Sequence, residues 1–267
     1  MEEARAADTA AAFPLCQLPL RMEDVESSGG SAAPFSLRVL CPEYIVFAVD
    51  TSAEMQRVDL AAPMTRLAFV REQLAVFTKI KHTINPAHYF ALVTFDAASG
   101  EPVWSGEFTN DPDVLLACFD AVVASAAGDA KAHDVQLDKT FRLVGTKVRM
   151  PAVGDDGGLQ YVVRLVLVYG RSDAAPQLAA GVPKPLADCP GLYFDAVYLH
   201  EPTPAKCQEI FDAIVSVEDH LSTSAYLFEA GRRVQKAVKG FATLVAHPLV
   251  RSGDQSDFAS GRLGVRG

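Results

Sequence analysis

The chain has 267 residues and a formal net charge of −9, and 49% of its residues are hydrophobic, enough for a sizeable core in one large or two small domains. The acidic balance argues against broad binding to nucleic acid or to an anionic membrane, because both need a surplus of Lys and Arg. The longest apolar run, residues 162–169, is far shorter than the roughly 20 residues that span a bilayer, and the acidic Met-Glu-Glu start lacks the basic region of a signal peptide.

Two segments at the ends of the sequence are expected to be flexible tails. Residues 1–40 are rich in Ala, Ser, Gly and acidic groups without lasting periodicity, and residues 252–267 are rich in Gly and Ser. We therefore expect the folded domain to span residues 41–251.

The first half of this domain alternates strand-like and helix-like segments. Apolar runs at residues 44–49 and 89–95 predict buried parallel strands, and helical spacing predicts a helix over residues 67–80 between them. A short edge strand is predicted at residues 102–108. The pair Asp111-Pro112 is typical of a helix start, with Asp as N-cap and Pro at the first helical position.

The second half continues this alternation to the end of the domain. Strands are predicted at residues 161–169, 193–199 and 225–228, and helices at residues 137–144, 207–217 and 234–245. The pattern predicts an α/β fold with a doubly wound, mostly parallel sheet and helices on both faces. The basic residues Arg232, Arg233, Lys236 and Lys239 are interpreted as a solvated helix face.

The cysteines predict neither a disulfide framework nor a zinc site. They are odd in number, widely spaced and without a C-x-x-C pair, so we expect reduced thiols in a cytoplasmic or nuclear protein. The five are Cys16, Cys41, Cys118, Cys189 and Cys207.

Ligands bind doubly wound sheets at the carboxyl ends of the strands, so the first strand end is the first place to look for a site. Asp50, Ser52 and Glu54 follow that strand at alternate positions. With the fold pattern, this segment resembles the von Willebrand A family, which is Rossmann-like. The resemblance implies a divalent metal held by an Asp-x-Ser-x-Ser loop, a Thr from a second loop and an Asp after the fourth strand. Magnesium prefers about six such oxygen ligands.

The match to that metal site is incomplete. Glu54 replaces the second Ser, Gly170 or Arg171 stands in place of the Asp, and residues 128–134 contain no Thr. We therefore predict a remnant without a bound metal, in which Arg171 supplies a positive charge instead. In the structural alternative, Asp50 caps its loop, and Ser52 and Glu54 cap the next turn.

The sequence offers no other catalytic constellation, and we expect neither an enzyme nor a cofactor. Its six histidines lack HExxH or HxH spacing, and there is no GxSxG, no Walker loop and no GxGxxG after a strand. A hydrolase or nucleotide enzyme on a doubly wound sheet thus has no motif in its favour. A metal-dependent ligand-binding von Willebrand A domain stays the alternative.

Several segments resemble one branch of this fold, the scaffold subunits of the BRISC and BRCA-A deubiquitinase complexes. The more specific segments are Asp50-x-Ser52-x-Glu54-Met55 and Ala246-His247-Pro248-Leu249-x-Arg251. The others, in the order of the family, lie at residues 41–43, 78–82, 90–93, 104–106, 111–112, 161–164 and 194–200.

This resemblance implies a non-catalytic subunit that is cytoplasmic and nuclear and acts in DNA-damage and cytokine-receptor signalling. Its expected partner is the ubiquitin-fold (UEV) subunit, and through it the metalloprotease that cleaves lysine-linked polyubiquitin and the scaffold of that protease. The Pro-x-x-Arg element of the family implies partner binding by His247, Pro248, Leu249 and Arg251. Pro248 is expected to end the last helix and begin an extended segment, with Arg251 able to bind a carboxylate or backbone carbonyls of the partner. The alternative is a plain helix end with a solvated Arg251.

Overall fold

The computed structural model describes residues 41–95, 99–122, 134–155, 157–201 and 204–251. Both predicted tails lie outside these residues, and so do residues 128–133 of the loop expected to carry a Thr. Within the described part of the chain, no helix combines the length and the apolar character needed to cross a membrane.

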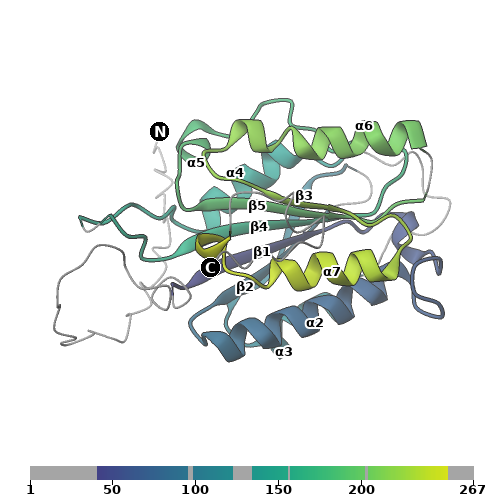
Figure 1. Cartoon of the computed structure of the whole chain (residues 1–267), viewed down its shortest axis with the longest axis horizontal. Coiled ribbons are helices and arrows are strands. Elements are labelled where there is room, and N and C mark those ends of the chain that lie inside the picture. Colours follow the sequence, from purple (N-terminus) through teal and green to yellow (C-terminus); the bar gives the residue numbers. More distant parts are fainter. Residues whose placement is uncertain (1–40, 96–98, 123–133, 156, 202–203, 252–267) are drawn as a thin grey trace, which may run out of the picture. The chain divides into compact units, whose positions relative to one another are not determined.

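A six-stranded sheet in the order β3-β2-β1-β4-β5-β6 forms the centre of the domain (Figure 1). Five strands are parallel, and β3 pairs with β2 antiparallel at one edge. This confirms the predicted mostly parallel sheet and its edge strand. The strands are β1 (Glu43–Val49), β2 (Tyr89–Phe95), β3 (Pro102–Thr109), β4 (Val162–Tyr169), β5 (Leu192–Tyr198) and β6 (Tyr226–Glu229).

Helices cover both faces of the sheet (Figure 1). One face carries α2 (Arg66–Ile84), α3 (Pro112–Asp120) and α7 (Val234–Leu244). The other carries α4 (Leu137–Lys147), α5 (Lys184–Ala187) and α6 (Pro204–Val215). Short 3-10 turns, η1 (Ala53–Gln56), η2 (Glu218–His220) and η3 (Pro248–Val250), complete the described elements.

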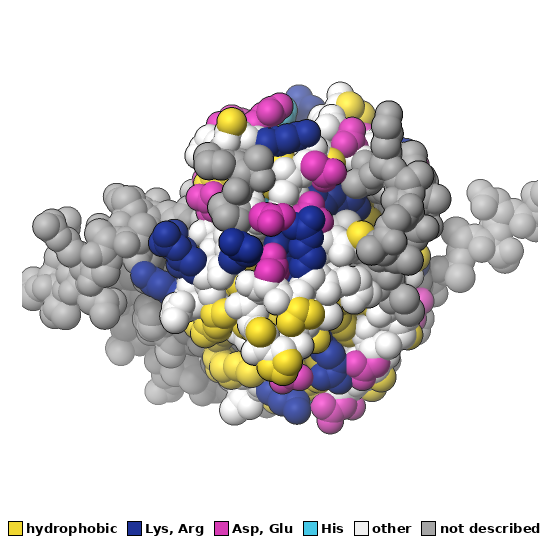
Figure 2. All heavy atoms as spheres, turned by 90° about the vertical axis from the view of Figure 1, so that its right-hand side faces the viewer, with side chains coloured by type: hydrophobic (Ala, Val, Ile, Leu, Met, Phe, Trp, Pro, Cys, Tyr) yellow, Lys and Arg dark blue, Asp and Glu magenta, His cyan; other side chains and the backbone are white. Residues whose placement is uncertain are grey.

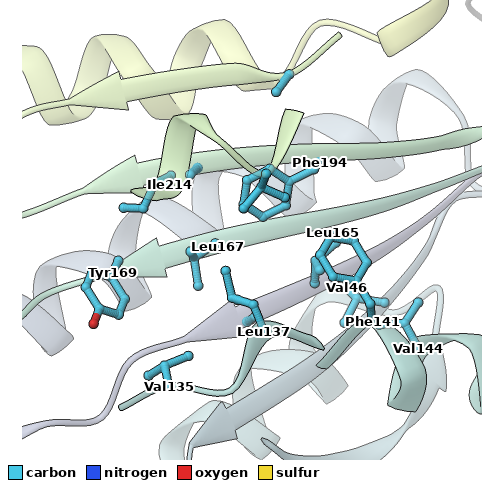
Figure 3. Packing of buried hydrophobic residues seen from close by; sticks show 14 of the residues in the cluster. Val46, Val135, Leu137, Phe141, Val144, Leu165, Leu167, Tyr169, Phe194 and Ile214 are labelled. Atoms are coloured by element: carbon cyan, nitrogen blue, oxygen red, sulfur yellow. The ribbon is translucent and has the colours of Figure 1, made fainter. Parts of the chain in front are cut away.

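The central strands form two hydrophobic cores because successive side chains of a strand point to opposite faces. In β1, Val46 and Ala48 enter one core, and Ile45 and Phe47 enter the other. Figure 3 shows the first core, where strand residues meet Phe141 of α4. Every residue of β4 is buried, as expected of a strand with helices on both faces.

The predicted helix starts and strands agree with the structure to within a few residues. Asp111 is the N-cap of α3 and accepts a hydrogen bond from the Asp113 amide at 2.9 Å. The sequence did not predict α5, because its four residues are too few to show a helical period.

Candidate functional site

The loops after β1 and β4 meet at the carboxyl edge of the sheet because these two strands are parallel neighbours. Asp50 follows β1 and is fully buried. Its carboxylate accepts hydrogen bonds from the Ser52 amide (3.1 Å) and hydroxyl (2.8 Å), and from the Gly170 amide (3.2 Å) across the gap. Asp50 therefore joins the two loops as well as capping its own.

Arg171 completes the coordination of this carboxylate. Its Nε atom donates to Asp50 Oδ1 at 3.0 Å, and the side chain is almost completely buried. Burial lowers the pKa of Arg171, but Asp50 together with Tyr169 and Asp173 outweighs burial, so the pKa lies above its usual value. The predicted positive charge at Arg171 is confirmed, and a guanidinium balances Asp50 where the family pattern would place an acidic metal ligand.

Glu54 binds the loop after β4 rather than capping its own turn. Its carboxylate accepts hydrogen bonds from the Ser172 amide and hydroxyl, both at 2.7 Å. Ser52 is the N-cap of η1, but its side chain makes no capping bond and donates to Asp50 instead. The alternative in which Ser52 and Glu54 cap the next turn is therefore wrong, because both side chains find stronger partners at or across the junction.

Arg66 is a member of this junction that the sequence did not single out. It is 1% exposed, donates to both carboxylate oxygens of Asp59, and reaches the Gly170 carbonyl at 3.1 Å. Gly170 itself packs against the loop after β1, since a Cβ there would lie 2.2 Å from Met55 Sδ. In the ranges that the structure describes, no group of three or more His, Cys, Asp or Glu residues could hold a metal ion.

The predicted partner-binding segment follows α7 at the opposite, amino edge of the sheet. His247 has an extended backbone (φ −65°, ψ 136°), as predicted for the residue before a proline. Pro248 then begins the 3-10 turn η3 instead of the extended segment that we expected. The His247 ring explains the turn, because its Nδ1 atom accepts the Leu249 amide at 3.1 Å while its Nε2 atom lies 3.0 Å from the Cys41 carbonyl.

Arg251 makes its carboxylate contact inside the domain. Its two terminal nitrogens donate to the two oxygens of Asp195 in β5 at 2.6 and 2.8 Å, and its guanidinium lies 4.2 Å from the centre of the Tyr226 ring. The expectation of a free Arg251 is corrected, because a buried carboxylate within the chain already forms the bidentate pair.

Arg251 and Asp195 belong to a buried charge network between the sheet and the ends of α2 and α7. Lys81 donates to Glu43, and Arg164 pairs with both Glu43 and Asp195. Burial raises the pKa of Asp195, but Arg164 and Arg251 outweigh it and lower the pKa to about 2. Burial likewise lowers the pKa of Lys81 to about 8, against the opposing effect of Glu43. This network anchors the C-terminal segment to three strands.

Solved structures show which class of fold this is. The VWA domain of SpRpn10 superposes with a TM-score of 0.51 at 16% identity, covering 79% of this chain and all of that domain. An aerotolerance-related membrane protein from Bacteroides fragilis superposes with a TM-score of 0.50 at 11% identity, covering 76% of this chain and 98% of that one. The chain therefore has the von Willebrand A fold, with a guanidinium bound to the first-strand carboxylate.

Similarity to proteins of known name shows which branch of that fold the chain resembles. The chain is 29% identical over 227 residues to BRISC and BRCA1-A complex member 1 of Homo sapiens and of Bos taurus, and 27% identical over 224 residues to that of Xenopus laevis. The matched part is 80% of this chain and 66% of the length of these relatives. No protein-family model matches the sequence. The resemblance to this family that the sequence indicated is confirmed.

Proposed function

We propose that this protein is a non-catalytic scaffold or adaptor subunit of a deubiquitinase complex that cleaves lysine-linked polyubiquitin. The observation that carries the proposal is the similarity to BRISC and BRCA1-A complex member 1 over 80% of the chain. The carboxyl edge of the sheet supports it, because Arg171 and Glu54 bind the loops to each other instead of presenting reactive groups. Nuclear and cytoplasmic action in DNA-damage and cytokine-receptor signalling is part of this proposal.

The proposed partner is the ubiquitin-fold (UEV) subunit, and the proposed docking element is the segment His247, Pro248, Leu249 and Arg251. Within it, His247 and Pro248 are buried, and Arg251 is held by Asp195. Leu249 is only partly buried, so its side chain is available for an apolar contact with the partner. Arg251 and His247 then serve binding indirectly by fixing the turn that presents Leu249.

Co-purification from cells, followed by mass spectrometry, tests the assembly as a whole. The full chain is expected to bring down a UEV subunit and a metalloprotease, and their absence would contradict the proposed function. For the docking element, Leu249→Ser is expected to weaken recovery of the UEV subunit about tenfold, because loss of a buried Leu contact removes about 1.5 kcal/mol or more.

The matched control is Val215→Ser on α6, a partly exposed apolar residue on the other face of the sheet. It is expected to leave recovery of the UEV subunit unchanged. Equal recovery with Leu249→Ser and Val215→Ser, at equal melting temperatures, would refute docking through Leu249 while leaving the complex itself in place.

A further inference from the structure

A pocket opens at the carboxyl edge of the sheet beside the start of α7. It has a volume of about 370 Å³, and its lining includes His200, Glu229, Arg232, Arg233 and Lys236. That volume lies within the range of small-ligand sites. Figure 2 looks onto this edge and shows Lys and Arg side chains gathered on the side where α7 begins.

Three exposed cations line the pocket. Arg232, Arg233 and Lys236 form no ion pair within the part of the chain that the structure describes. The charge of Arg232 contributes to lowering the pKa of Asp59. Both carboxylate oxygens of Asp59, however, already accept hydrogen bonds from Arg66. Such a cluster is notable on a chain with a net charge of −9. These residues were interpreted from sequence as a solvated face, and their place in a pocket was not predictable from helical spacing.

The single carboxylate in the pocket has a partner of its own. His200 Nε2 lies 3.0 Å from Glu229, and its Nδ1 atom lies 3.0 Å from the Glu201 carbonyl. Both ring nitrogens of His200 thus lie within hydrogen-bonding distance of an oxygen atom. Glu229 therefore has a hydrogen-bonding partner in His200, and neither group is paired with Arg232, Arg233 or Lys236 among the described residues.

The backbone beside these cations also favours an anionic ligand. Gly231 has a positive φ of 55°, which suits glycine and turns the chain from β6 into α7. Among the described residues, no side chain caps the start of α7, and the first turn of this helix contains no acidic residue. The amide groups at that end carry a partial positive charge that adds to that of the three side chains.

We propose that this pocket binds a phosphate monoester, and that its source is a phosphoserine or phosphothreonine side chain of a partner protein. A phosphate offers nearly two negative charges and three acceptor oxygens to three cations, whereas a carboxylate offers one charge and two oxygens. The pocket also has room for the side chain that carries the phosphate. This proposal does not depend on the identity of the complex or on the docking of Leu249.

The test is an NMR titration of the full chain with inorganic phosphate, with a phosphoserine peptide, and with the same peptide carrying Glu or unmodified Ser. The phosphoserine peptide is expected to bind at least about tenfold more tightly than the Glu peptide, with amide shifts at Gly231 and Lys236. Comparable binding of inorganic phosphate and the phosphopeptide would support the phosphate site but identify the free ion as its ligand. Equal binding of the Glu and phosphoserine peptides would overturn the proposal in favour of a general acidic-peptide site.

Two double variants test whether the phosphopeptide binds in this pocket. Arg232→Ala with Lys236→Ala is expected to weaken phosphopeptide binding at least about tenfold, since it removes two of the three cations that would form charge-assisted hydrogen bonds with the phosphate. Arg142→Ala with Lys184→Ala removes the same charge from exposed residues of α4 and α5 and is expected to leave binding unchanged. Equal weakening in both pairs, or no shift at Gly231 and Lys236, would overturn the proposal and identify the basic residues as a solvated face.

Discussion

Two buried histidines are held neutral by their hydrogen bonds. His88 Nδ1 accepts the Glu43 amide at 2.9 Å, and His247 Nδ1 accepts the Leu249 amide at 3.1 Å. Protonation at Nδ1 would break either bond. Burial lowers the pKa of each ring to about 4, against the opposing effect of Glu43. The two rings therefore link the stability of the charge network to pH.

Stability is expected to fall as the pH falls from about 6.5 to about 4. In that window the unfolded rings bind protons and the folded rings of His88 and His247 do not, so acid favours unfolding. Each ring contributes up to about 3 kcal/mol to this loss. Urea titrations between pH 7 and pH 4 measure it. His247→Gln is expected to reduce the pH dependence by about half, and the exposed His220→Gln is the control that leaves it unchanged.

Arg251 is expected to contribute strongly to the free energy of unfolding, although it lies at the end of the domain. Replacing it with Ala leaves the fully buried Asp195 with Arg164 as its ionic partner and removes the guanidinium from the Tyr226 ring. Loss of one member of a buried pair costs about 3 to 5 kcal/mol. Denaturant unfolding of Arg251→Ala should show this loss, whereas Arg142→Ala, an exposed arginine on α4, should stay within about 0.5 kcal/mol of the native chain. A native-like midpoint for Arg251→Ala would contradict the structural role of the pair.

At the scale of elements, the loops that follow β1 and β4 each contribute a charged side chain, Asp50 and Arg171, and the two form a buried ion pair. Asp50 accepts four hydrogen bonds, from Ser52 (two), Gly170 and Arg171. A magnesium ion at this carboxylate would have to displace the Arg171 guanidinium and break the hydrogen bond that the Ser52 hydroxyl donates to Asp50. The loops are thus fixed to each other by contacts that a metal would have to break.

Calorimetric titration of the chain with magnesium or manganese is therefore expected to give no micromolar isotherm. The same titration of Asp50→Asn separates binding at this carboxylate from binding elsewhere. A micromolar isotherm that is present in the native chain and lost in Asp50→Asn would favour the alternative, a metal-dependent ligand-binding von Willebrand A domain.

At the scale of the whole molecule, the sequence by itself determined the sheet, the two helix layers and the family resemblance. Apolar periodicity depends on neighbours in the chain, so runs such as residues 44–49 and 89–95 identify buried strands without knowledge of their partners. The charged residues Arg164 and Asp195 inside apolar strands were a signal of paired burial, yet their positions did not say which residues pair with them.

Only the tertiary structure decided the partners of the charged groups. Arg171 reaches Asp50 across 121 positions of sequence, and Arg251 reaches Asp195 across 56. The physical reason is that a buried charge is stabilised by whatever group the fold brings within hydrogen-bonding distance, and that distance depends on strand order and loop course. For the same reason, only the tertiary structure shows that Arg251 binds Asp195 within the chain. It also shows that Arg232, Arg233 and Lys236 line a pocket.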